Sequence, residues 1–186
     1  MHHRANAKWA GISTIAGALG FIAILVPLHL AQTGYDPAYQ LMSELALGQY
    51  GWAMLFAFLS LGAAILAILP GIATRDASPL LMIVLAAAAV CFLGAGLFPL
   101  GHNSEIHIAM MAGAFVLIGL AMVMFPAKAG RFAPRIFRIT SRTLAGAMAL
   151  CLALGHNLIP AGLAQRLAAL CLISWLLLIG WKLIRH

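Results

Sequence analysis

The chain has 186 residues, of which 64% are hydrophobic and only 8% are charged, and its formal net charge is +7. Soluble domains contain roughly 45–50% apolar and about 25% charged residues, so this composition excludes an ordinary soluble fold. The basic residues lie between apolar runs, and we therefore interpret the charge as a signal of membrane topology rather than of nucleic-acid binding. The three cysteines lie inside apolar runs without paired spacing, which is typical of small core residues: Cys91, Cys151 and Cys171.

Six apolar runs follow one another along the chain, separated by polar and turn-forming residues. Each is about 20 residues long, the length that crosses a bilayer as a helix. A segment in lipid must satisfy its backbone polar groups internally, so each run is predicted to be helical. The sequence thus predicts an all-α polytopic helix bundle, a single transmembrane domain over residues 1–186. The predicted spans, within a few residues, are 9–31, 52–73, 79–99, 107–126, 142–161 and 166–183.

The basic residues predict the orientation of the spans. With the N-terminus in the cytoplasm, ten of the eleven Lys and Arg residues fall on the inner side, and only Arg166 falls outside. This distribution agrees with the positive-inside rule. The sequence therefore predicts that both termini are cytoplasmic and that the protein lies in the cell membrane. The first run is longer than the apolar part of a signal peptide, so we expect it to be retained.

Two loops have patterns of their own. In the first outer loop, residues 32–51, Asp36-Pro37 is typical of a helix start and Gly48 of a helix stop, which predicts a short interfacial helix. The loop before the fifth run carries arginines at helical spacing, which predicts either a basic amphipathic segment against anionic lipid or an ordinary positive-inside loop. These arginines are Arg131, Arg135, Arg138 and Arg142.

Histidines and acids gather at the outer ends of the predicted spans. Apart from His2, His3 and His186 at the termini, every histidine falls on this side. Ionisable groups at membrane depth usually face the interior of a bundle or a cavity, so we expect a shared polar pocket. The simplest alternative is that these residues cap helix ends. The polar residues at this level are His29, Glu44, His102, Asn103, Glu105, His107, His156, Asn157 and Arg166.

These polar residues, together with Ser43, suggest three kinds of site: a metal site, a catalytic site and a site that binds an anionic headgroup. His102, His107 and His156 are the candidate ligands of a divalent metal such as zinc, although their spacing matches no known zinc motif. Ser43, Glu44 and His107 are the candidate catalytic residues, as nucleophile, acid–base partner and base.

Arg166 and Asn157 are the candidate binding residues. A guanidinium can hold a phosphate or carboxylate with two hydrogen bonds, which predicts a clamp for an anionic headgroup. The alternative for Arg166 is a helix-end arginine paired with Glu44 or Glu105.

Several short segments together resemble a known family. They are Tyr35-Asp36-Pro37, Met42-Ser43-Glu44-Leu45, Tyr50-Gly51-Trp52, Phe98-Pro99 followed by His107, and Gly162 to Leu167 leading to Trp175. The chain is similar to the small polytopic membrane proteins of the domain-of-unknown-function 998 family. The resemblance implies a compact multi-helix membrane domain without an assigned reaction, and shared positions at Ser43, Glu44, Pro99, His107 and Arg166. In that family an acid commonly follows Phe-Pro, where this chain has Leu100-Gly101-His102.

The sequence leaves three functions open. The first is an outward-facing polar His/Glu/Arg pocket that binds or processes a lipid headgroup or other amphiphile. The second is a metal- or haem-binding redox protein, with haem held between histidines such as His29 and His156. The third is a non-catalytic subunit of a membrane complex. Membrane lipids and a membrane-protein partner are the expected partners, and nucleic acid is not.

Overall fold

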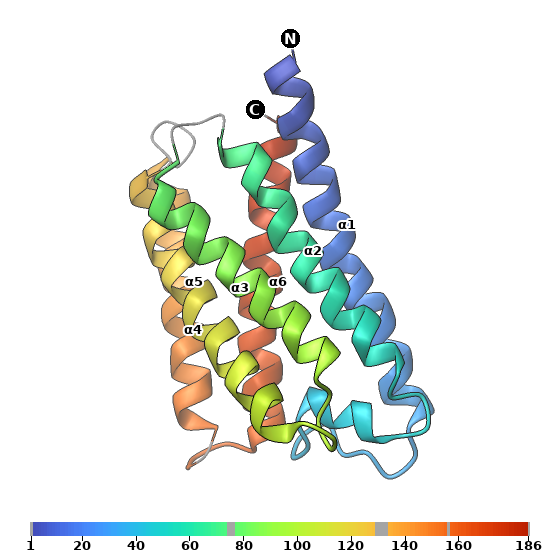
Figure 1. Cartoon of the computed structure of the whole chain (residues 1–186). Coiled ribbons are helices and arrows are strands. Elements are labelled where there is room, and N and C mark those ends of the chain that lie inside the picture. Colours follow the sequence, from blue (N-terminus) through green and yellow to red (C-terminus); the bar gives the residue numbers. More distant parts are fainter. Residues whose placement is uncertain (1, 74–76, 129–133, 156, 186) are drawn as a thin grey trace.

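The computed structural model describes residues 2–73, 77–128, 134–155 and 157–185. The described residues form six long α-helices and one short 3₁₀ helix, with no strand among them (Figure 1). The elements are α1 (His2–Ala31), η1 (Met42–Leu47), α2 (Ala53–Ala73), α3 (Pro79–Leu97), α4 (Ser104–Lys128), α5 (Arg135–Leu154) and α6 (Ala161–Arg185).

The six long helices form a closed ring in which each helix packs against its neighbours in the chain and α1 packs against α6. Both termini lie at one end of this bundle, and η1 lies at the opposite end, which we call the far end (Figure 1). Each long helix contains a stretch that is long and apolar enough to cross a membrane. The prediction of an all-α bundle with six spans is therefore confirmed, whereas the cytoplasmic position of the termini stays a prediction.

The core of the bundle is filled by large apolar side chains from several helices. Trp175 of α6 is fully buried and packs its indole edge-on against Phe125 of α4. Its Nε1–H donates to Ser141 Oγ at 2.8 Å, and that hydroxyl donates to the Met122 carbonyl at 2.6 Å. Since a buried polar group without a partner is unfavourable, this short chain of bonds allows the indole to lie in the core.

The fifth helix differs most from its predicted span. It runs over Arg135–Leu154 instead of 142–161, and its N-cap position is Pro134. The predicted start is too late because hydropathy treats a group of arginines as the end of a span. Arginines near a helix end can extend their charged groups toward water, so the helix can continue through them. The predicted basic amphipathic segment is therefore the first part of α5, apart from Arg131, which lies outside the described residues.

The first loop contains the predicted short helix, but it begins later than expected. The 3₁₀ helix η1 starts at Met42 and ends before Gly48, its C-cap residue. Asp36 caps only a preceding turn, in which its Oδ1 accepts from Ala38 N at 2.8 Å. Asp36-Pro37 therefore begins a turn and not the helix. The helix begins at Met42, where the loop contacts the bundle.

Candidate functional site

The first loop is fastened to the start of α6 by backbone hydrogen bonds. Leu163 N donates to Ala38 O at 2.8 Å, and Gly162 N donates to Tyr39 O at 3.2 Å. The first amides of a helix have no partner within the helix, so the loop carbonyls satisfy donors that would otherwise be free. Gly162 permits this approach, because a methyl group there would overlap loop carbonyl oxygens, including that of Gln40. We call residues 35–42 and 162–166 the loop–α6 junction.

Arg166 lies at the centre of this junction, and protein groups already occupy its guanidinium. One terminal nitrogen, Nη1, donates to Gln40 O at 2.8 Å and to Gly162 O at 2.9 Å. The other, Nη2, donates to His29 Nε2 at 2.8 Å and to the Tyr35 hydroxyl. An arginine with four such bonds holds the loop, α6 and α1 together. Its role as an anion clamp stays a prediction.

The partners of Arg166 have defined protonation states. His29 Nδ1 lies 2.7 Å from the Leu25 carbonyl, so Nδ1 carries the proton and Nε2 accepts from Arg166. Burial raises the pKa of the Tyr35 phenol above its ordinary value, an effect that the Arg166 guanidinium partly offsets. The phenol therefore stays protonated and donates to Leu41 O at 2.8 Å. Since both ring nitrogens of His29 are bonded to protein, they are not free for haem.

Glu44 is engaged in the loop itself. Its Oε1 accepts from Leu41 N at 2.9 Å, and its Oε2 accepts from Gln40 Nε2 at 3.3 Å. No hydrogen bond joins Glu44 to Arg166 within the described chain. The two residues instead contact different atoms of Gln40, which makes this residue the link between them.

His107 differs from Arg166 and Glu44, because one of its ring nitrogens has no hydrogen-bond partner within the described residues. The residue is 1% exposed, and its Nδ1 lies 2.9 Å from Ala95 O and 3.0 Å from Phe98 O. These two carbonyls fix the proton on Nδ1 and leave a lone pair on Nε2. Nε2 is buried and makes no hydrogen bond within the described residues. An unsatisfied buried polar atom costs about 1–3 kcal/mol, so a missing partner must be considered.

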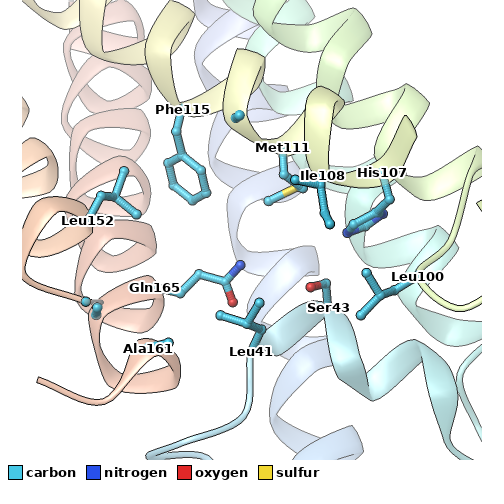
Figure 2. Close-up of a pocket in the computed structure, with 13 residues that line it drawn as sticks. Leu41, Ser43, Leu100, His107, Ile108, Met111, Phe115, Leu152, Ala161 and Gln165 are labelled. Atoms are coloured by element: carbon cyan, nitrogen blue, oxygen red, sulfur yellow. The ribbon is translucent and has the colours of Figure 1, made fainter. Parts of the chain in front are cut away.

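A cavity of about 360 Å³ lies beside this ring at the far end of the bundle. Figure 2 shows His107, the Ser43 hydroxyl and the Gln165 amide around it. Gln165 Oε1 accepts from Met42 N at 2.7 Å, so this oxygen is used and the amide NH₂ group remains. Ser43 is also buried, and its hydroxyl makes no hydrogen bond within the described residues. The remaining lining is apolar and includes Leu41, Met111 and Phe115.

Two other predicted site residues do not line this cavity. His102 and Asn157 are exposed in the turns that precede α4 and α6. His156 lies outside the described residues. Within the described ranges, no three His, Cys, Asp or Glu side chains form a group that could hold a metal ion. The set of His102, His107 and His156 stays a prediction.

The sequence analysis gave no role to Gln165 or to Tyr35. Gln165 is the buried polar residue that joins η1 to the cavity, and Tyr35 is a main partner of Arg166. Gln165 lies just before the predicted sixth span, 166–183, so the apolar runs did not mark it as a buried polar residue. Three of the segments quoted for the family resemblance lie close together here. Tyr35 and Arg166 belong to the junction, and Ser43 follows its last loop residue, Met42.

Comparison with known proteins gives one result. The family model described as "Protein of unknown function (DUF998)" matches residues 15–182, which is most of the chain. No curated protein and no solved structure matches.

Proposed function

The chain belongs to the DUF998 family of proteins of unknown function, and we propose that it is a membrane protein that binds a neutral amphiphile in its far-end cavity. The polar part of this ligand would contact His107, Ser43 and Gln165. The observation that carries the proposal is the unpartnered Nε2 of His107, which is buried beside an apolar cavity. Apolar cavities with a few convergent polar groups are typical of small-molecule sites.

The groups in the cavity favour a neutral ligand over an anionic one. Among the described residues, the cavity lining contains no Asp, Glu, Lys or Arg. Two carbonyls hold the proton of His107 on Nδ1, so the ring presents Nε2 to the cavity as an acceptor. Its Nε2 can accept one hydrogen bond, while Ser43 and Gln165 can donate. A lipid with a hydroxyl and a carbonyl, such as a partial acylglycerol or a fatty amide, matches this set.

The apolar part of the ligand has a path between helices. The cavity shares Ala112, Phe115 and Leu152 with a second, larger space between α4 and α5. Ala112 is exposed, so this side of the cavity faces the region that lipid would occupy around a membrane protein. An acyl chain can therefore enter from the side, which supports a lipid over a water-soluble ligand.

The experiment compares lipids that co-purify with the full chain and with two variants, measured by mass spectrometry after detergent exchange. Asn at position 107 keeps a nitrogen near Nδ1 but removes Nε2, so His107→Asn should lower bound neutral lipid by roughly 5- to 100-fold, as expected for loss of a buried hydrogen bond. Ala112→Phe should block the side opening and have a similar effect.

The matched controls are His102→Asn and Ala63→Phe, because both residues are exposed and neither lines the cavity. Both should retain lipid as the unmodified chain does. Equal lipid content in all five proteins would overturn the proposal, since it would indicate lipid bound around the bundle without a specific site.

The orientation is part of the proposal, and the charge distribution supports it. We infer that the far end faces outward and that the protein lies in the cytoplasmic membrane. Tyr39 and Arg135 are exposed at opposite ends of the bundle, so single cysteines there, in a chain whose native cysteines are replaced by alanine, report the two sides. An impermeant thiol reagent should label Tyr39→Cys in intact cells and Arg135→Cys only after lysis. The reverse pattern would contradict this orientation.

The catalytic roles of Ser43, Glu44 and His107 stay predictions. Ser43 and His107 line the same cavity, but no hydrogen bond joins them within the described residues, and Glu44 is bonded to its own loop. A purely structural subunit would show no specific lipid, so the lipid measurement also distinguishes that alternative.

A further inference from the structure

A second apolar space lies between α4 and α5, nearer to the termini than the far-end cavity. This α4/α5 groove has a volume of about 750 Å³, and among the residues that the structure describes Arg142 is the only charged one that lines it. The other lining side chains are apolar or small. We propose that this groove binds one anionic phospholipid of the leaflet on the side of the termini, with its phosphate at Arg142 and one acyl chain along α5.

The first support is uncompensated charge. Arg135, Arg138 and Arg142 are exposed and recur at i, i+3 and i+7, so they share one side of α5. Within the described residues, none of their guanidinium groups is hydrogen-bonded or ion-paired to a protein group. Like charges one turn apart repel, and an external anion relieves this repulsion. A lipid phosphate at the membrane surface supplies that charge.

The second support is a glycine that protein packing does not explain. Other glycines in the spans lie where two helices meet, as Gly11 of α1 and Gly180 of α6 do against each other. A Cβ added at Gly146 would instead meet nothing within 4 Å. Glycine in a helix interior is less favourable than alanine, and no close approach of protein offsets this. Gly146 lines the groove one turn beyond Arg142, where it leaves room for an acyl chain.

The third support is length. The groove extends along α5 from Arg142 to Leu152, and ten residues of helix correspond to about 15 Å. The hydrocarbon core of a bilayer is about 30 Å thick, so this length corresponds to about one leaflet. A phospholipid with its phosphate at Arg142 would thus extend its chain to the level of Leu152, where the far-end cavity begins. The headgroups of the two ligands would lie in different leaflets, whereas the two spaces share Ala112, Phe115 and Leu152 where they meet.

The test uses the full chain in a neutral detergent with phosphatidylglycerol or phosphatidylcholine as added probe, and counts bound lipids by native mass spectrometry. The unmodified chain should retain one phosphatidylglycerol in preference to phosphatidylcholine. Arg142→Gln should weaken phosphatidylglycerol binding about tenfold. Gly146→Phe should weaken it as well, because its ring fills the groove while Arg142 remains.

The controls separate this site from general attraction to basic residues. Arg185→Gln removes an exposed charge from the same end of the bundle but not from the groove, and Ala63→Phe adds a ring at an exposed position outside the groove. Both should bind as the unmodified chain does. If Gly146→Phe fails to fold, Ala149→Phe blocks the same groove from an exposed position. Equal loss in Arg142→Gln and Arg185→Gln, equal binding of the two lipids, or full binding in the blocked variant would overturn the proposal. None of these outcomes affects the neutral-lipid site.

Discussion

The loop–α6 junction and the far-end cavity contain similar kinds of residues but differ in how completely their hydrogen bonds are formed. At the junction, Arg166, His29 and Tyr35 bond to one another and to backbone carbonyls. In the cavity, a few residues away along α6 and the loop, His107 and Ser43 each retain an unused polar atom. The comparison shows that residue type alone does not identify a binding site. A site is distinguished by polar groups that the protein positions but does not satisfy.

The largest expected effect on stability is at the junction. Arg166→Gln removes most of four hydrogen bonds and leaves partly buried acceptors without donors, so we expect a loss of about 3 kcal/mol in the free energy of unfolding. Thermal unfolding in detergent measures this loss. Arg185→Gln is the control, because Arg185 is exposed and only stacks on Trp181. Similar unfolding temperatures for the two variants would contradict a structural role for Arg166.

A medium effect is expected where the loop meets α6. Gly162→Ala places a methyl group against loop carbonyl oxygens, and the backbone must move to relieve the overlap. Such overpacking typically costs about 1–3 kcal/mol. Limited proteolysis should then cut the loop near Tyr39 faster than in the unmodified chain. Gly146→Ala is the matched control, since its methyl group enters open space and should leave the cleavage rate unchanged.

The smallest effects provide the most direct contrast between the two regions. Tyr35→Phe removes a hydroxyl that donates to Leu41 O and accepts from Arg166, so it should destabilise the chain by about 1–2 kcal/mol. Ser43→Ala removes a hydroxyl without a protein partner and should change stability by less than about 0.5 kcal/mol. Thermal unfolding of the two variants checks this difference. A larger loss in Ser43→Ala than in Tyr35→Phe would reverse the assignment of the two regions.

Much of the fold was predictable because a bilayer permits few solutions. A run of about 20 apolar residues must be helical there, so hydropathy alone located all six helices. The start of α5 was missed because hydropathy averages over Arg135 and Arg138, although the helix begins with them. The beginning of η1 was missed for another reason. Asp36-Pro37 is a local turn signal, whereas the position of η1 depends on contact with α6 through Met42 and Gln165.

The candidate site was predictable only in its location. Histidine placement predicted a shared polar pocket at one end of the bundle; at that end His107 and Ser43 line one cavity, and their roles stay predictions. The sequence could not show that Arg166 is fully bonded, since its partners include backbone carbonyls that any residue would supply. It also could not show that Gln165 contributes to the site, because a neutral amide carries no charge signal. These distinctions depend on three-dimensional contacts.

The contact between α1 and α6 has a consequence for how the protein is made. The ring closes only when α6, the last of these six helices to leave the ribosome, reaches a helix that entered the membrane first. Until then, the sides of α1 and α5 that pack on α6 face lipid, and the carbonyls of Ala38 and Tyr39 lack their α6 donors. A nascent chain released without α6 would retain an open seam. Arg166 of α6 bonds to His29 of α1 and to Gln40 of the first loop, so these bonds can form only after α6 has taken its place in the bundle.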